Sequence, residues 1–439
     1  MNPGRLLVAL LIVTGLIGSL VSGAAFSTHL LVTGLLLLVG AWIWVTVLAR
    51  SILLERNPDF HRASVGDIFK EQYEVRNMSL LPGLWVELHN QMALPTAAGS
   101  RLLTRLRPRE KQIYVARTWL TQRGGFPIGP TVLGISDPLG LFRVERRFPP
   151  ERTLVILPMI FQIESFLSPP GLVPGGPVIH RRTADITPHA SGIRDYAPGD
   201  PMKRIHWPTS ARRGTLMVKE FEQDPQAEVW LFLDAQGKVL SQKASETVAM
   251  PIENLLFSRK PKLTLLPSTL EYEISIAASL AHYFLGERRA VGLVTDDSPY
   301  TMIAAERGER QESKLLEMLA FVQGKGHLPI SALVGTQAGQ LPQGSTVILI
   351  TPSTSLDLMI VADDLQRRRL SPVVILLAAE SFGGPEGSRE ISQRLMAQRV
   401  PVCLIYCEAN LSQALSAFSA NNPLQGMSTW QRPTLSHLT

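Results

Sequence analysis

The sequence contains very little cysteine. Its two cysteines, Cys403 and Cys407, lie in or just after one apolar stretch, residues 400–406, of a chain of 439 residues. Two cysteines at this spacing form neither a disulfide framework nor a zinc-binding pattern. We therefore expect both side chains to behave as small buried apolar groups.

The chain also lacks a Gly-x-x-x-x-Gly-Lys-Ser/Thr motif. That motif forms the phosphate-binding loop of P-loop enzymes, so nothing in the sequence indicates that this chain hydrolyses ATP itself. Lys and Arg form no block either: the net charge is +6, and the basic residues are spread along the chain. Because nucleic-acid-binding domains carry a clustered basic surface, we expect no nucleic-acid partner.

Charged residues are missing from two apolar stretches, residues 6–25 and 30–49. Each stretch is long enough to cross a hydrocarbon core of about 30 Å. Only the short segment 26–29 separates them. Residues 1–50 are therefore predicted to form a two-helix transmembrane hairpin.

The basic residues that flank these stretches predict an orientation. Arg5 precedes the first stretch, and Arg50, Arg56 and Arg62 follow the second, whereas the linker between the stretches has no Lys or Arg. By the positive-inside rule, both chain ends then lie in the cytoplasm. The alternative is a cleaved signal peptide ending near Ala24 or Ala25, which would leave the second stretch as an anchor and export the rest.

Residues 57–167 have the pattern of a small β-sandwich. Short apolar or alternating runs are separated there by Pro, Gly, Asn and Asp residues, which favour turns. The runs are residues 68–75, 85–88, 112–119, 131–135 and 154–157. The next stretch, residues 168–188, is rich in Pro and Gly and is predicted to be a linker, because it can form neither a helix nor a central strand.

Strands alternate with helices in the rest of the chain, within residues 189–420. Residues 228–234 form a continuous apolar run that ends at Asp234, as expected of a strand buried on both faces. Further strands are predicted at residues 290–294, 346–350, 373–378 and 400–406, and helices at 272–283, 312–322 and 356–369, from 388 and from 411. This alternation predicts a doubly wound α/β sheet. Residues 421–439 show no periodicity, so we expect a disordered tail.

The most polar stretch of the chain runs from Gly192 to Glu222. We single out ten candidate site residues within it: Arg194, Asp195, Tyr196, Gly199, Asp200, Arg204, His206, Trp207, Ser210 and Arg212. Charges crowded around a Pro-Gly turn must pair with one another or with a partner. The stretch is therefore either a binding surface or a structural clasp. In the clasp, Asp200 pairs with Arg204 or Arg212, and Trp207 packs beneath them.

A third interpretation of this stretch is catalytic. Asp200, His206 and Ser210 have the residue types of an acid, a base and a nucleophile. Residue types alone do not identify such a triad, because it is recognised by its geometry. We therefore expect no catalytic residues here and keep an enzyme of envelope metabolism as an alternative.

The same stretch resembles the bacterial membrane proteins labelled "domain of unknown function 58". The matching residues are Arg194, Tyr196, Gly199, Asp200, Arg204, Ile205, Trp207, Ser210, Ala211, Arg212, Leu216, Val218, Lys219 and Glu220. A second match lies upstream, at Arg123-Gly124, Gly129-Pro130 and the segment from Asp137 to Phe142, where Leu139 stands in place of the more usual Phe. Together the resemblance covers nearly the whole chain.

This resemblance implies both an architecture and a role. The α/β part would be a von Willebrand factor A-like domain, and the hairpin would lie in the bacterial inner membrane. The implied partner is a MoxR-type AAA+ ATPase, with a role in assembling or maturing envelope or secreted complexes. We therefore expect a membrane-anchored adaptor. An exported adhesion-like module is the remaining alternative.

Metal-binding A domains begin their site with an Asp-x-Ser-x-Ser run, whose oxygens suit a hard divalent cation. Here the run is Asp234-Ala-Gln236-Gly-Lys238, so both hydroxyls are absent and Lys238 adds a positive charge. We expect a degenerate site at Asp234 that binds no metal. We also expect no cofactor.

Overall fold

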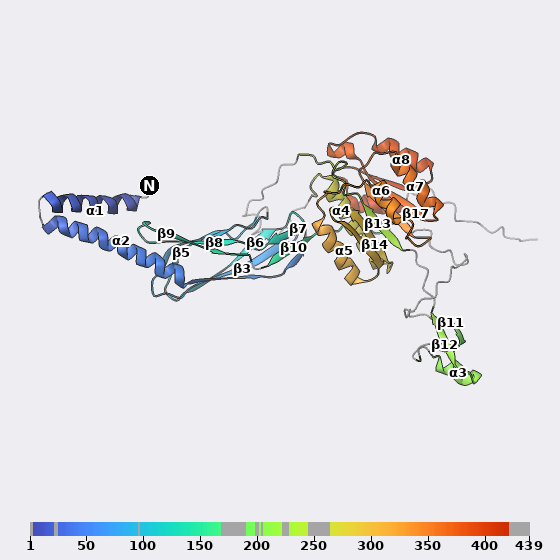
Figure 1. Cartoon of the computed structure of the whole chain (residues 1–439), viewed down its shortest axis with the longest axis horizontal. Helices are drawn as coiled ribbons and strands as arrows, with labels where there is room; N and C mark the ends of the chain where they lie inside the picture. Colours follow the sequence, from blue (N-terminus) through green and yellow to red (C-terminus); the bar gives the residue numbers. More distant parts are fainter. Residues whose placement is uncertain are drawn as a thin grey trace, which may run out of the picture. The chain divides into compact units, whose positions relative to one another are not determined.

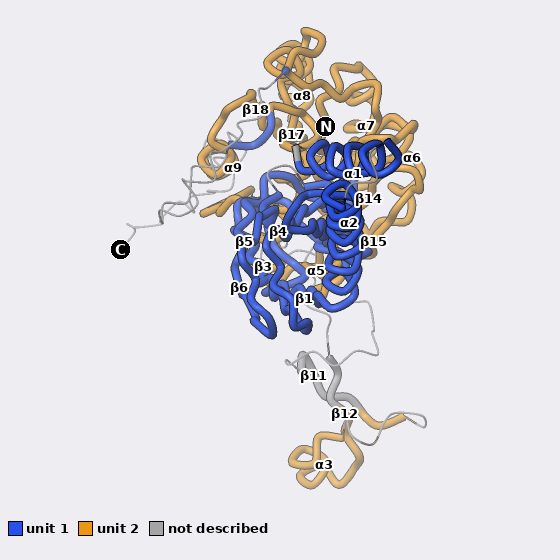
Figure 2. Tube along the Cα trace, turned by 90° about the vertical axis from the view of Figure 1, so that its left-hand side faces the viewer, with its two compact units in different colours: residues 1–160, 244–266, 316–322 blue, residues 161–243, 267–315, 323–439 orange. Residues whose placement is uncertain are grey.

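Figure 1 shows the computed structural model of the chain, which divides into two compact units. The structure describes residues 3–21, 25–94, 97–150, 152–167, 190–197, 202, 205–221, 228–244 and 264–420. The predicted linker 168–188 and the predicted tail 421–439 lie outside these residues. The first unit comprises residues 1–160, 244–266 and 316–322, and the second comprises the rest (Figure 2).

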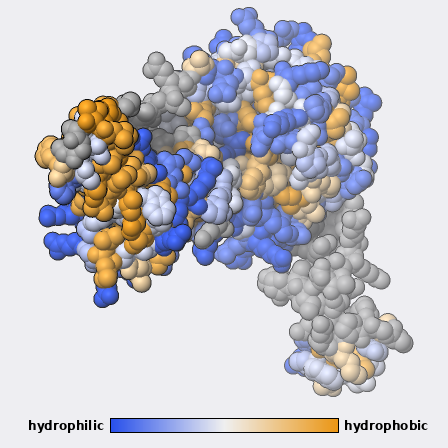
Figure 3. Space-filling view, turned by 60° about the vertical axis from the view of Figure 1, so that its left-hand side comes forward, coloured by the Kyte–Doolittle hydropathy of each residue, from blue (hydrophilic) through white to orange (hydrophobic). Residues whose placement is uncertain are grey.

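Two antiparallel helices open the first unit, α1 (Pro3–Val21) and α2 (Ala25–Ser51). Both are long and apolar enough to cross a membrane, and Figure 3 shows their apolar side chains as an orange surface. Glycines permit their close contact: a Cβ added at Gly15 would lie 2.5 Å from the Leu31 amide nitrogen. Small residues let apolar helices approach closely in this way.

Helix α2 continues into the sandwich without a linker. It ends at Ser51, and β1 (Ile52–Pro58) begins at the next residue, five residues before the sandwich start predicted at 57. Leu48 and Ile52 are both fully buried in one apolar cluster. The Arg146 guanidinium donates to the carbonyls of Ala49 in α2 and Ile52 in β1, both at 3.0 Å, and so pairs one acceptor that the helix end leaves open. The last turns of α2 therefore belong to the core of the sandwich.

Residues 52–157 of the first unit form β-structure, as the sequence predicted. Three sheets have the strand orders β1-β3-β6, β5-β4-β8-β9 and β2-β10-β7. The strands are β2 (Arg62–Ser64), β3 (Ile68–Asn77), β4 (Gly83–Asn90), β5 (Arg101–Leu106), β6 (Lys111–Trp119), β7 (Gly124–Pro127), β8 (Thr131–Ser136), β9 (Arg143–Phe148) and β10 (Thr153–Leu157). Alternate side chains of β3, such as Phe69 and Tyr73, are fully buried, as expected of a strand with one face on the core.

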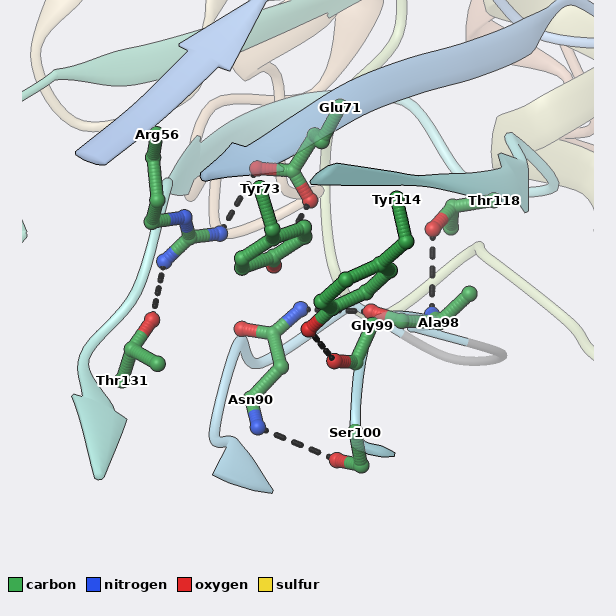
Figure 4. Close-up of polar contacts among 10 residues, drawn as sticks. All are labelled: Arg56, Glu71, Tyr73, Asn90, Ala98, Gly99, Ser100, Tyr114, Thr118 and Thr131. Carbon is green, nitrogen blue, oxygen red and sulfur yellow. Dashed lines mark hydrogen bonds and ion pairs between the residues drawn. The ribbon is translucent and has the colours of Figure 1, made fainter. Parts of the chain in front are cut away.

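A buried ion pair lies inside the sandwich (Figure 4). Arg56 on β1 donates to Glu71 on β3 at 2.6 Å, with side chains only 14% and 1% exposed. The strand register places Arg56 opposite Tyr73 and Tyr73 opposite Tyr114. The guanidinium consequently lies 5.0 Å from the centroid of the Tyr73 ring, which stacks on Tyr114 at 5.1 Å. The Arg56 guanidinium also donates to the Thr131 hydroxyl at 2.5 Å.

We expect Glu71→Leu to lower the free energy of unfolding of the full chain in detergent micelles by about 3–5 kcal/mol, because Arg56 stays buried without its partner. Urea unfolding measures the change. The double variant Arg56→Met, Glu71→Leu should recover much of the loss, since both charges are then removed. The control is Glu145→Leu, because Glu145 is 58% exposed in its pair with Arg143 and such pairs contribute only about 0.2–1 kcal/mol. Equal losses at Glu71 and Glu145 would contradict the prediction.

The second unit contains a six-stranded sheet with the order β15-β14-β13-β16-β17-β18. All neighbours are parallel except β14 and β15. The strands are β13 (Val229–Leu233), β14 (Val291–Asp296), β15 (Tyr300–Glu306), β16 (Thr346–Thr351), β17 (Ser371–Leu377) and β18 (Val402–Ile405). Every residue of β13 and β16 is buried, so both faces of the sheet are covered.

Helices alternate with these strands, as predicted. They are α4 (Thr269–Gly286), α5 (Glu309–Phe321, whose residues from Leu316 fall in the first unit), α6 (Ile330–Gln337), α7 (Asp357–Arg367), α8 (Ser388–Ala397) and α9 (Leu411–Ala420). Helices α6, α7 and α8 share one apolar cluster with the sheet, and α4 contacts β13, β14 and β16. Strand β15 and helix α6 were not predicted from the sequence.

Candidate functional site

The polar stretch forms a small separate motif in the second unit. Strands β11 (Ala190–Asp195) and β12 (Met217–Phe221) pair antiparallel, and the short helix α3 (Trp207–Arg213) lies between them in sequence. The backbone of Arg194 pairs with Val218, and the Tyr196 amide donates to the Leu216 carbonyl at 2.9 Å. Gly199, Asp200 and Arg204 lie outside the described residues, as does the side chain of Arg194.

Ser210 holds the helix against the strand. Its hydroxyl, in a residue only 7% exposed, donates to the His206 carbonyl at 3.1 Å and accepts from the Met217 amide at 2.9 Å. Gly214 ends the helix in the left-handed region with φ 70°, and its amide donates to the Ser210 carbonyl, which is a common helix ending for glycine. The hydroxyl of Ser210 therefore has a structural partner on each side.

The side chains of His206 and Ser210 are not arranged as a catalytic base and its nucleophile. The His206 ring nitrogen Nδ1 lies 2.7 Å from the Thr209 hydroxyl and accepts from the Thr209 amide at 3.3 Å. Within the described part of the motif, no hydrogen bond joins the His206 ring to the Ser210 hydroxyl. A base must reach its nucleophile to activate it, and here both side chains serve the helix instead.

The prediction that Trp207 packs beneath the charged residues is wrong: its side chain is 63% exposed. Met202 is 74% exposed and Leu216 44% exposed, and Arg212 is also on the surface. These side chains surround a motif whose interior is filled by smaller residues, among them Ile205. The motif thus presents an aromatic ring, apolar side chains and positive charge together.

A second polar cluster lies at the carboxyl ends of the parallel strands. Asp234 directly follows β13, is 2% exposed, and accepts from the Thr351 hydroxyl at 2.6 Å and from the Gln236 amide at 3.2 Å. Burial raises the pKa of Asp234 to about 6, although both hydrogen bonds favour the ionised form. Asp234 is therefore easily protonated for an aspartate.

Glu273 of α4 also belongs to this cluster and was not predicted from the sequence. It is 0% exposed, and neither carboxyl oxygen has a hydrogen-bond partner among the described residues. Burial raises its pKa well above the ordinary value, and the charge of Asp234 adds to the effect. A signal was available: Glu273 lies three and seven residues before Ile276 and Leu280, on the face predicted to be buried.

The same edge of the sheet is closed by the chain's own loop. The Asp297 carboxylate accepts from the amides of Gln323 and Lys325 at 2.7 and 2.8 Å, and the Asp296 carboxylate accepts from two further amides of this loop. A Cβ added at Gly326 would lie 1.9 Å from the Asp296 carbonyl oxygen, so only glycine fits there. Both aspartates are thus occupied by backbone groups.

These contacts decide whether this edge of the sheet could hold a metal ion in the way that metal-binding A domains do. The described residues include no group of three or more His, Cys, Asp or Glu side chains that could hold a metal ion. Asp234 already accepts two hydrogen bonds, and Gln236 and Lys238 supply no hydroxyl. Since a hard cation needs several converging oxygens, this donor set does not fit one.

We expect Glu273→Gln to raise the stability of the full chain at pH 7–8 and to leave it nearly unchanged at pH 4. The raised pKa means that the folded chain keeps a proton which the unfolded chain releases, so wild-type stability falls as the pH rises above about 4.5, by at most about 1.4 kcal/mol per pH unit. Gln stays neutral and removes this loss.

Urea unfolding at several pH values measures the difference between the two chains. Glu287→Gln is the control, because Glu287 follows the same helix and is exposed. A Glu273→Gln chain that tracks wild type at every pH would contradict the assignment of a buried neutral carboxyl.

A further prediction concerns Ser210→Ala, which leaves the Met217 amide without its acceptor. Losing such a buried hydrogen bond costs about 1–3 kcal/mol. Tryptic cleavage after Arg213 should therefore accelerate roughly tenfold, because cleavage follows the population of the opened motif. Thr215→Ala is the control, since Thr215 is exposed and its hydroxyl contacts only the Met217 sulfur. Cleavage at the wild-type rate would show that the hydroxyl does not hold the motif.

Two solved structures show only slight likeness to the chain. A CARDB domain from Pyrococcus furiosus is 11% identical, with 24% of this chain and 91% of that chain covered and a TM-score of 0.19. The human complex of zinc 2-glycoprotein and prolactin-inducible protein gives 12% identity, coverage of 24% and 96%, and a TM-score of 0.19. Similarity this low supports no argument about fold or function.

Two sequence comparisons are informative. Residues 192–250 match the family described as "Protein of unknown function DUF58". The uncharacterized protein YeaD of Bacillus subtilis (strain 168) is 26% identical over 208 residues, which span 46% of this chain and 44% of YeaD. The aligned region is thus less than half the length of either protein. The matched family segment begins at Gly192, where the polar stretch begins, so the two findings support a DUF58-like segment in this part of the chain.

Proposed function

We propose that the protein is a membrane-anchored adaptor that presents the β11–α3–β12 motif to a protein partner. The proposal depends most on which side chains of the motif are buried and which are exposed: Ser210 and Ile205 are buried, while Trp207 is 63% exposed. A motif that served only as a clasp would bury its largest apolar side chain. Exposed Trp and Arg are the residues that most often dominate binding energy at protein interfaces.

The partner that the family resemblance suggests is a MoxR-type AAA+ ATPase. A partner of this kind would supply ATP hydrolysis, for which this chain has no P-loop. The adaptor would then serve the assembly or maturation of envelope or secreted complexes. Arg212 and the exposed Arg213 give the motif positive charge, so the complementary surface would be acidic with an apolar pocket for Trp207.

The proposed location is the bacterial inner membrane, with both chain ends in the cytoplasm. Support comes from the two apolar helices and from Arg5 and Arg50, which lie at the helix ends away from the connecting segment 26–29. Protease added outside intact cells would then leave the α/β unit whole. Its digestion from outside would favour the exported alternative.

We further propose that the α/β unit is von Willebrand factor A-like. The strand order and the single antiparallel strand at the edge, β15, are consistent with this, as is Asp234 at the end of β13. In open α/β sheets, ligands bind at this edge of the sheet. Here the edge carries a closing loop and buried carboxyls, which favours recognition by the β11–α3–β12 motif over metal-dependent capture.

The enzyme alternative has less support. The Ser210 hydroxyl is buried and bonded to backbone groups, and the His206 ring contacts Thr209. Neither side chain is placed to act on a substrate. Binding is therefore the function that the motif's geometry favours.

Purification of the tagged full chain from native membranes tests the adaptor role. We expect an AAA+ ATPase to co-purify with wild type and its recovery to fall at least tenfold with Trp207→Ala or Arg212→Glu, while thermal unfolding is unchanged. Trp85→Ala is the control, because Trp85 is 54% exposed on the sandwich. Undiminished recovery of the ATPase with both motif variants would refute the binding role. If both variants unfold at a lower temperature than wild type, the motif is a structural clasp instead.

A further inference from the structure

A groove lies between the end of α2 and strand β9. It has a volume of about 400 Å³ and is lined by Thr46, Ala49 and Arg50 from the helix and by Val144 and Arg146 from the strand. Two guanidinium groups thus share one site with apolar side chains, whereas the Thr46 hydroxyl donates to the Trp42 carbonyl at 2.7 Å. Groups of this kind suit an anion that carries an apolar part.

The level of the groove along the hairpin can be derived from the packing of its helices. Val8 of α1 lies in one apolar cluster with Ala41 of α2 and with Leu141. Since α2 rises about 1.5 Å per residue, Arg50 lies roughly 14 Å beyond Ala41. Arg5, the first charge of α1, lies three residues or roughly 4.5 Å before Val8, so Thr46 and Arg50 lie roughly 3 and 9 Å beyond the level of Arg5. A headgroup layer that begins near Arg5 is about 5–7 Å thick. The groove therefore falls at headgroup level when the hairpin spans a bilayer.

The turn between β8 and β9 fixes this level. The Arg5 side chain donates through Nε to the Leu141 carbonyl at 2.9 Å. A Cβ added at Gly4 would lie 2.1 Å from the Leu139 carbonyl oxygen, so the turn touches the backbone of α1. The Asp137 carboxylate, 1% exposed, shapes the turn by accepting from the amides of Leu139 and Phe142 at 2.8 and 2.6 Å. The sandwich consequently holds β9 beside the first turn of α1.

Among the described residues, no carboxylate forms an ion pair with Arg50 or Arg146 of the groove. Arg50 is exposed and makes no ion pair in the part of the chain that the structure describes. Arg146 is held in place by its bonds to the Ala49 and Ile52 carbonyls. The acidic residue of β9, Glu145, pairs with Arg143 instead, and both lie on the opposite face of the strand because neighbouring side chains alternate.

From this arrangement we propose that the groove binds the phosphate of an anionic phospholipid headgroup. Guanidinium groups donate in pairs to phosphate oxygens, and basic pockets beside membrane helices bind anionic headgroups. Val144 and Ala49 would contact the glycerol and the first methylenes. The bound lipid would fasten the sandwich to the membrane surface. The site rests on the membrane location proposed above and is independent of the adaptor role.

Native mass spectrometry of the full chain, with phosphatidylglycerol or phosphatidylcholine added to detergent micelles, tests the site. We expect phosphatidylglycerol to bind more tightly than phosphatidylcholine and Arg50→Gln to weaken it about tenfold, because a charge-assisted hydrogen bond is lost. Arg147→Gln is the matched control: Arg147 neighbours Arg146 on β9 but lies on the opposite face. It should bind like wild type.

Three outcomes would overturn the proposal. Equal binding of the two lipids would show an unspecific lipid shell, and equal losses with Arg50→Gln and Arg147→Gln would show general charge attraction. Competition by millimolar inorganic phosphate that fully displaces the lipid would show a site for free phosphate. Carbonate washing of membranes distinguishes failure of the proposed membrane location from failure of the lipid site. A chain released by carbonate refutes both. If the chain is retained, the lipid-binding measurements alone decide whether the lipid site exists.

Discussion

The peptide bond between Ser51 and Ile52 connects the apolar hairpin to the rest of the first unit without any intervening loop. Leu48 on the helical side and Ile52 on the strand side are both fully buried in the same cluster. A helix end normally leaves its last carbonyls open to water, and here Arg146 from β9 supplies the donors. Because both sides of the junction are fixed by packing and by hydrogen bonds, the sandwich cannot swing freely on the hairpin.

Buried ionisable side chains have different surroundings in the two units. In the sandwich, Arg56 and Glu71 neutralise each other, and Tyr73 and Tyr114 extend the stack, so the buried charges are paired, while the Arg56 Nε has no hydrogen-bond partner among the described residues. In the α/β unit, Glu273 has no partner among the described residues, and its burial favours the protonated form. The first arrangement costs desolvation and gains a defined register. The second makes stability depend on pH, since a proton must stay bound in the folded chain.

Much of the fold could be predicted because it follows from periodicity. Continuous apolar runs such as residues 346–350 mark strands buried on both faces, and the structure has β16 there. Strand β15 was missed because it is an edge strand: its burial alternates between exposed and partly buried, and no residue is fully buried. The α2–β1 junction was missed because an apolar helix running directly into an alternating strand shows no turn residue.

The position of the candidate motif in the sequence could be predicted, but the arrangement of its side chains could not. Its density of charge was visible, and the family comparison begins at the same residue, Gly192. Exposure of Trp207 could not be predicted, because a lone Trp in a polar segment is equally compatible with a clasp and a surface. The role of Ser210 depends on a contact with Met217, seven residues away, which spacing alone does not reveal.

Hydrogen–deuterium exchange of the full chain in lipid nanodiscs tests the junction most directly. If α2 and β1 form one packed element, the amides of residues 48–51 and the β1 amides that face β3 exchange as slowly as those of β3, residues 68–77, in the same sheet. Fast exchange of these amides beside a protected β3 would show a flexible linker at this point and would contradict the account.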